Sequence, residues 1–211
     1  MAAFTLADAV DDVLPHLAAD PSSPVTELAI RNAAIEFCST SGVWTYTQED
    51  ASLTAGQRAV ELEPDMGAAV VRVLSVRYRG KALAPANQGK WLDEVEYGDP
   101  TGAPRFWAQN DTEQVLLHPV PVTSQAGVLE IDLALQPSRA ATTIPGWIWA
   151  KWGERIVDGA LARLMLMPGK PWSAPDLGAL HRQLFHGAMH NAQAGAITNR
   201  ARAPLRTRSR H

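Results

Sequence analysis

The chain has few of the features that mark secreted or membrane proteins. Its single cysteine, Cys38, cannot form a disulfide within the chain, so nothing in the sequence requires an oxidising compartment. The N-terminus lacks the positively charged start and the apolar run of a signal peptide. Asp8, Asp11 and Asp12 place charges where such an apolar run would lie. No window approaches the roughly 18 apolar residues that span a bilayer. We therefore expect assembly in a cytoplasm and no membrane partner.

The standard signatures of enzymes are also missing. The sequence contains no GxSxG, no GxxxxGK followed by Ser or Thr, no GxGxxG, no HExxH and no CxxC. His186 and His190, four residues apart, could share a metal ion, but no Glu accompanies them, which favours a solvated helix face. Cys38 lies beside Phe37 on an apolar stripe, which favours a buried, inert thiol over a nucleophile. We expect no enzymatic activity, no cofactor, no metal and no small-molecule substrate.

Carboxylates are absent from the end of the chain. No Asp or Glu follows Asp176, and the last 35 residues carry a formal charge of +6. Since the whole chain has a formal charge of −3, residues 1–176 carry −9. Five of the arginines lie in the last 12 residues: Arg200, Arg202, Arg206, Arg208 and Arg210. This asymmetry predicts a basic tail with its own partner, either an acidic protein surface or phosphates, and the alternative is a solubilising end.

Helical periodicity marks the first 42 residues. Residues 5–14 carry apolar side chains at helical spacing with three Asp residues near the N-terminal end, so we expect a helix that Pro15 limits. A second helix is expected from Ser23, as N-cap, and Pro24 to about Ser39, with Gly42 just beyond it. Its expected core stripe is Leu28, Ile30, Ala33, Ala34, Phe37 and Cys38.

From residue 43 the apolar period changes to two. The segments 43–48, 69–78, 105–108, 114–117 and 128–135 are rich in β-branched and aromatic residues and predict strands. Turn signals separate them at 64–67, 79–81, 98–102, 119–121 and 125–127. Short strands at this spacing predict a small antiparallel sandwich or barrel.

Helical spacing returns after Pro145. One helix is expected to bury Trp149, Trp152, Ile156, Ala160, Leu161, Leu164 and Met165 and to end at residues 168–169. The last helix, capped by Ser173, is expected to bury Leu177, Leu180, Leu184, Phe185, Ala188 and Met189. Residues beyond about Ala196 are too polar to order themselves.

These elements predict an α+β fold in which the N-terminal and C-terminal helical pairs form one four-helix body. Neither pair has another long element to cover its apolar stripe, so the two ends of the chain must meet. The expected domains are residues 1–42 with 137–198 for the helical body, 43–136 for an inserted β-domain, and 199–211 for a flexible basic tail.

The chain has seven tryptophans, three of them between residues 147 and 152. Trp149 and Trp152 fall on the expected core face, which favours packing over stacking on a nucleobase. Trp147 falls off that stripe, and we expect it and Trp44 to be anchors of a subunit interface.

The order of these segments resembles the head-to-tail adaptor, or connector, proteins of tailed bacteriophages, in particular the longer type with an inserted β-domain. The resemblance rests on residues 28–44, 117–121, 144–147 and 152–172 and on the last helix around Phe185, and it covers nearly the whole chain. None of these segments is catalytic.

The resemblance implies a structural virion protein in the neck of the particle, assembled in the host cytoplasm. In this family twelve wedge-shaped copies form a ring that docks below the portal protein, extends the DNA channel and offers a platform to tail or nozzle proteins. The expected partners are therefore other copies of the chain, the portal, tail or nozzle proteins and the packaged DNA.

The main alternative is a nucleic-acid-binding module that uses the basic tail. Such a module would have a basic strand face, whereas Glu61, Glu63, Asp65 and the acidic residues 93–99 make the β-domain acidic. The acidic loop lacks the ligand spacing of a calcium site, which favours a solvated loop. The other alternative, a hydrolase or metal enzyme, would need convergent polar residues that the sequence does not offer.

Overall fold

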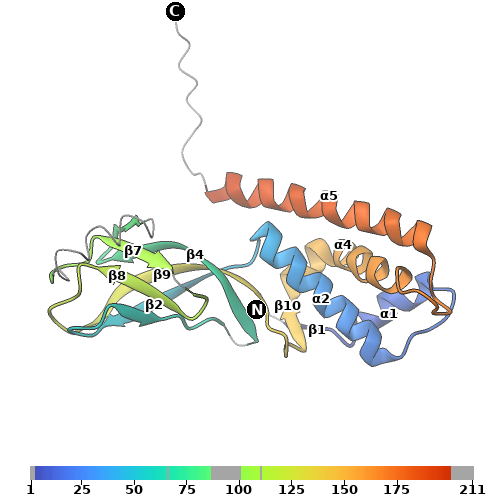
Figure 1. Cartoon of the computed structure of the whole chain (residues 1–211), viewed down its shortest axis with the longest axis horizontal. Coiled ribbons are helices and arrows are strands. Elements are labelled where there is room, and N and C mark those ends of the chain that lie inside the picture. Colours follow the sequence, from blue (N-terminus) through green and yellow to red (C-terminus); the bar gives the residue numbers. More distant parts are fainter. Residues whose placement is uncertain (1–2, 66, 87–100, 110, 201–211) are drawn as a thin grey trace, which may run out of the picture. The chain divides into compact units, whose positions relative to one another are not determined.

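The computed structural model describes residues 3–65, 67–86, 101–109 and 111–200. For residues 198–200 it describes the backbone only. The chain divides into two compact units: the helical unit, Met1–Val43 with Ala141–His211, and the β-unit, Trp44–Ala140. The chain thus leaves the helical unit, completes the β-unit and returns (Figure 1). The expected α+β class with an inserted β-domain is confirmed.

Three long helices build the helical unit. Its described elements are β1 (Ala3–Thr5), α1 (Val10–Val13), the 3-10 helix η1 (Leu14–His16), α2 (Ser23–Ser41), β10 (Thr143–Pro145), α4 (Gly146–Met165) and α5 (Pro175–Arg200). Helices α2, α4 and α5 pack on one another, and α1 packs on α2 and α4. Phe37 of α2 lies at the centre of the core, with ring centroids 5.4 Å from Trp152 of α4 and 6.1 Å from Phe185 of α5.

The ends of α2 follow from its sequence. Pro24 lies in the first turn, where its missing N–H costs no intrahelical hydrogen bond, and Ser22 rather than Ser23 is the N-cap residue. Gly42 adopts a left-handed φ of 60° and its N–H donates to Cys38 O at 2.9 Å. This conformation, which glycine adopts without strain, ends the helix.

The helix expected over residues 5–14 is wrong in its first half. Residues 3–5 form β1, which pairs antiparallel with β10, and the Phe4 ring stacks on Trp149 with centroids 4.6 Å apart. Only Val10–Val13 is α-helical, and η1 continues it. Tertiary pairing and an aromatic stack therefore override the local helical pattern.

The expected core faces of α2 and α5 are wrong at four leucines. Leu28, Leu177, Leu180 and Leu184 are 51%, 52%, 51% and 42% exposed. Phe185, Ala188 and Met189 of α5 are buried as expected, together with Gly178 and Ala192. Small residues on this face let the helices approach closely: a Cβ at Gly159 of α4 would lie 2.7 Å from the Phe185 ring.

The ends of α5 also differ from the expectation. Ser173 does not cap the helix: its hydroxyl donates to Met165 O at 3.3 Å, and α5 begins at Pro175 with Ala174 O accepting from Gly178 N–H. The helix continues to Arg200, two residues into the expected tail. The rest of that tail, residues 201–211, lies outside the described residues.

The described residues of the β-unit form two four-stranded sheets. One has the order β2 (Thr45–Leu53), β9 (Gln125–Pro137), β4 (Ala68–Tyr78), β5 (Lys81–Ala82), and the other β3 (Ala59–Glu61), β8 (Gln114–His118), β7 (Phe106–Gln109), β6 (Ala84–Pro85). Alternate residues of β9, Leu129, Ile131, Leu133 and Leu135, are fully buried. The pairings are antiparallel except for the short parallel pair β6 and β7, which the sequence did not predict.

Of the turns that the sequence predicts in these sheets, the one at residues 79–81 is confirmed and the one at 125–127 is wrong. Arg79 and Gly80, both at positive φ, form the tight turn between β4 and β5 as expected. Residues 125–127 do not form a turn but belong to β9, where the pairing with β2 shifts register between Ala51 and Leu53. Gly127, at φ 63°, accommodates this irregularity inside a long strand.

Candidate interaction surfaces

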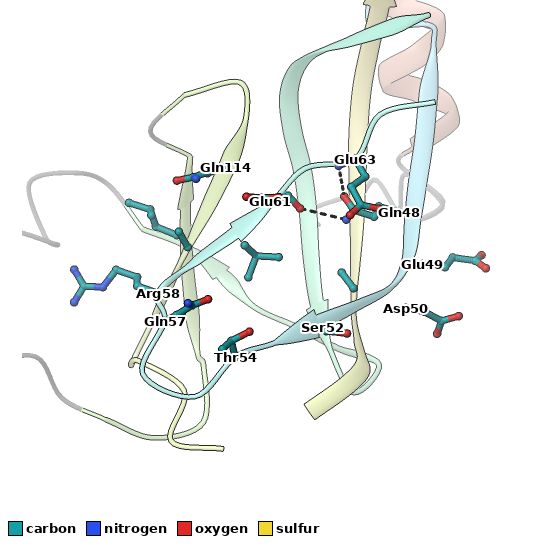
Figure 2. A pocket seen from close by; sticks show the side chains of 14 residues that line it. Gln48, Glu49, Asp50, Ser52, Thr54, Gln57, Arg58, Glu61, Glu63 and Gln114 are labelled. Carbon is teal, nitrogen blue, oxygen red and sulfur yellow. Dashed lines mark hydrogen bonds between the residues drawn. The ribbon is translucent and has the colours of Figure 1, made fainter. Parts of the chain in front are cut away.

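The β-unit contains a polar pocket of about 760 Å³ beside strands β2 and β3. Figure 2 shows the Gln48 side chain at one end, where its amide donates to Glu61 O (3.2 Å) and accepts from Glu63 N–H (3.0 Å). The wall contains the hydroxyls of Ser52 and Thr54, and no histidine, cysteine or lysine is among its described lining residues.

The charge of this pocket opposes phosphate binding. Four carboxylates line it, those of Glu49, Asp50, Glu61 and Glu63, with Arg58 as the one guanidinium among the described lining residues. A phosphate-binding surface needs the opposite balance. The expected acidic character of the β-domain is thus present at Glu61 and Glu63, whereas residues 93–99 lie outside the described part.

A second polar site lies in the helical unit around Asp158, which the sequence analysis missed. Asp158 is buried, and its two oxygens are 3.0 Å from Arg155 Nη1 and 2.9 Å from His181 Nδ1. His181 belongs to α5 and Asp158 to α4, so the carboxylate joins the two helices. Both oxygens are occupied, which makes this a structural tie. The signal in the sequence was a lone Asp on the apolar face of α4.

The possible nucleophile and metal ligands of the helical unit do not converge. Cys38 is 1% exposed, and burial raises the pKa of its thiol to about 12, so almost no thiolate forms near neutral pH. His186 is partly exposed, with Nε2 3.8 Å from Glu36 Oε1, and His190 is exposed. Within the described residues no three metal-binding side chains cluster. These positions therefore show no catalytic arrangement.

No helix in the described part of the chain combines the length and the apolar character needed to cross a bilayer.

The two tryptophans expected at an interface lie in different environments. Trp44 is 6% exposed, and its carbonyl accepts from Leu135 N–H at 2.8 Å. Its ring is thus buried within the single chain, and its role as an anchor stays a prediction. Trp147, in the first turn of α4, is 38% exposed and remains a candidate.

The expected basic tail, residues 199–211, overlaps the last two residues of α5. Arg200 is the last residue of that helix. The other four candidates, Arg202, Arg206, Arg208 and Arg210, lie outside the described residues. Among the residues of α5 whose burial the structure describes, Ala192 is the last buried one, and all five arginines follow it in the sequence.

Comparison with known proteins gives one clear relationship. A family model described as SU10 adaptor protein matches residues 4–208, a span that includes both units. None of the curated proteins compared with the chain matches it. A match over almost the whole length agrees with the resemblance to phage adaptors, and we conclude that the chain belongs to the SU10 adaptor protein family.

Proposed function

We propose that this chain is the head-to-tail adaptor of a tailed phage, of the longer type with an inserted β-domain. About twelve copies form a ring that docks on the portal protein, extends the DNA channel and provides the platform for tail or nozzle proteins. The ring assembles in the host cytoplasm and becomes part of the neck of the virion. It has no enzymatic activity.

The family match over residues 4–208 carries this proposal. Because the match runs through the helical unit and the β-unit alike, the whole chain follows the family pattern. The buried Asp158 supports a structural role, since its carboxylate joins the two helices α4 and α5.

The arginines at the end of the chain give the ring its contact with the portal or with DNA. Arg200, Arg202, Arg206, Arg208 and Arg210 provide planar guanidinium groups that bind carboxylates and phosphates bidentately. In a ring, each copy adds five of these groups to one basic collar. Trp147 is the proposed anchor between subunits.

Electron microscopy of a mixture with the cognate portal tests the adaptor role. We expect negative-stain images to show rings stacked on the portal for the full chain and weakened stacking for a chain that ends at Asn199. A complete lack of association at every salt concentration would exclude the adaptor role and favour the nucleic-acid-binding alternative.

A charge-matched variant separates the two partners of the tail. Replacing the five arginines by lysine keeps the charge but removes the bidentate fork, so portal docking through carboxylates should weaken. Binding to DNA should depend mainly on charge. In a plot of the logarithm of the binding constant against the logarithm of the salt concentration, each phosphate that the tail neutralises should contribute a slope of about −0.9. Loss of docking with unchanged DNA binding would identify the portal as the partner of the tail.

A further inference from the structure

A cavity of about 230 Å³ in the helical unit receives side chains from all three long helices. Its charged or titratable lining residues are Glu36 of α2, Arg163 of α4, and Arg182 and His186 of α5. The apolar part of its wall includes Ala162 and Leu166. The cavity thus combines two guanidinium groups, an imidazole and a carboxylate with an apolar surface.

The guanidinium of Arg163 is held in a fixed orientation. Its Nη1 donates to Gly159 O at 2.8 Å, and its Nη2 donates to Asn32 O at 3.4 Å and to the carboxylate of Glu36. The guanidinium also lies 5.7 Å from the centroid of the Phe185 ring. An arginine has five N–H groups, so two of them have no acceptor within the described residues. Arg163 is therefore an oriented cation whose capacity to donate hydrogen bonds is not exhausted.

Arg182 brings a second positive charge to the cavity without a counterion. It is exposed, and it makes no hydrogen bond or ion pair within the described part of the chain. Glu36 already accepts from Arg163 through Oε2, and its Oε1 lies 3.8 Å from His186 Nε2. The nearest carboxylate of α5, Asp176, is six residues away and lies on another side of the helix. Two guanidinium groups thus face one carboxylate among the described lining residues.

We propose that this cavity binds one further carboxylate, that of a Glu or Asp side chain on another protein. Arg182 supplies the planar fork that binds a carboxylate bidentately, and Arg163 adds a fixed positive charge. Ala162 and Leu166 contact the methylene groups of the incoming side chain. The proposed function assigns partner contacts to Trp147 and to the C-terminal arginines, so this is a further site, built from residues of all three long helices.

The charge of the helical unit favours an acidic side chain over nucleic acid as the ligand. Residues 1–43 and 141–196 contain nine Asp and Glu against six Lys and Arg. Nucleic acid brings one negative charge with every nucleotide, and a surface of this composition repels it. The two arginines and Glu36 of the cavity carry a formal charge of +1 together, which a single carboxylate neutralises.

Methyl NMR spectra of the full chain test the site, because Ala162 and Leu166 place methyl groups in its wall. The probe is the α-amide of N-acetylglutamate, which carries the single carboxylate of a glutamate residue. The matched control is the corresponding glutamine compound, which is neutral. At constant ionic strength, the glutamate compound should shift both methyl signals along a saturable curve, whereas the glutamine compound should leave them in place. Equal shifts with the two compounds would overturn the proposal.

Three substitutions test the roles of the charged side chains. Arg182→Gln should weaken binding of the glutamate compound about tenfold or more, because the bidentate fork is lost. The control Arg139→Gln removes an exposed arginine from the β-unit and should leave the dissociation constant unchanged. Glu36→Gln should strengthen binding, since it removes the carboxylate that competes for Arg163. Unchanged binding by Arg182→Gln, or weaker binding by Glu36→Gln in a variant whose circular dichroism matches the unmodified chain, would exclude a carboxylate site.

Dimethyl phosphate distinguishes an acidic side chain from nucleic acid. It carries one negative charge, as a phosphodiester does, but lacks the aliphatic stem that contacts Leu166, so it should bind less tightly than the glutamate compound. Equal or tighter binding of dimethyl phosphate would overturn the assignment to a protein side chain. The titration uses this chain without the portal, so its failure leaves the adaptor role intact, and a failure of docking on the portal leaves this site intact.

Discussion

The helical unit and the β-unit bury their apolar side chains to different extents. Among the described residues, seven of the ten large apolar side chains that are exposed belong to the helical unit, four of them on α5. The β-unit exposes Tyr46, Phe106 and Val122. The helical unit therefore exposes more of the apolar side chains that mark contacts with other proteins, and the β-unit exposes a polar, acidic surface.

The two units also differ in what holds them together. In the helical unit, large rings fill gaps that small residues leave, as Phe185 does beside Gly159. In the β-unit, Asp132 on the central strand β9 accepts from Thr47 of β2 and from Ser75 and Arg77 of β4. Each unit thus has a shared carboxylate, Asp158 in the first and Asp132 in the second, and the first unit adds the close fit of Phe185 beside Gly159.

Phe185→Ala should have the largest effect. The ring is 1% exposed and contacts the core of all three long helices, so its removal should lower the free energy of unfolding of the helical unit by about 3–5 kcal/mol. Urea unfolding followed by circular dichroism at 222 nm measures the change. The control, Phe106→Ala, removes a 37% exposed ring from the β-unit and should cost less than about 1 kcal/mol. Similar losses for both variants would contradict the role of Phe185.

Asp132→Ala should have a smaller effect, confined to the β-unit. The side chain accepts hydrogen bonds at 2.8 Å from Thr47 Oγ1, 2.5 Å from Ser75 Oγ and 3.2 Å from Arg77 Nη2. Loss of a charged acceptor shared by three strands should cost about 1.5–3 kcal/mol. Asp132→Asn keeps an acceptor for the hydroxyls and should lose less. An unchanged urea midpoint of the β-unit for Asp132→Ala would show that the carboxylate is dispensable.

The sequence predicted the elements of both units better than the faces they bury. Helix α2, helix α4 and strand β4 have strong periods and end signals such as Gly42, so local physics sufficed. The face of α5 depended on Gly159, whose missing Cβ admits Phe185, and no periodic pattern reveals such a fit. Strand β1 depended on β10, about 140 residues away in the chain. Long-range pairing of this kind leaves little local signal.

The interaction sites were predictable only in part. Trp147 is exposed because it lies off the apolar stripe of α4, a feature that the sequence shows. Trp44 is 6% exposed, which a lone tryptophan in an expected strand does not indicate. The exposed Leu177, Leu180 and Leu184 of α5 have the same periodic spacing as a core face, so the sequence predicted that they would be buried.

The rate at which Cys38 is labelled, which needs no substitution at that residue, gives the sharpest comparison of the two units. Burial raises the pKa of the thiol from 9.0 to about 12, so the native protein should react with a thiol reagent at pH 8 only when the helical unit opens. Phe185→Ala should speed labelling a hundredfold or more, whereas Asp132→Ala should leave it unchanged. Because the unfolded thiol ionises from about pH 9 and the native thiol only near pH 12, its contribution to stability is complete below pH 9 and declines above it. If Asp132→Ala accelerated labelling as strongly as Phe185→Ala, the two units would open together. They would then be distinct in structure but would unfold as one cooperative unit.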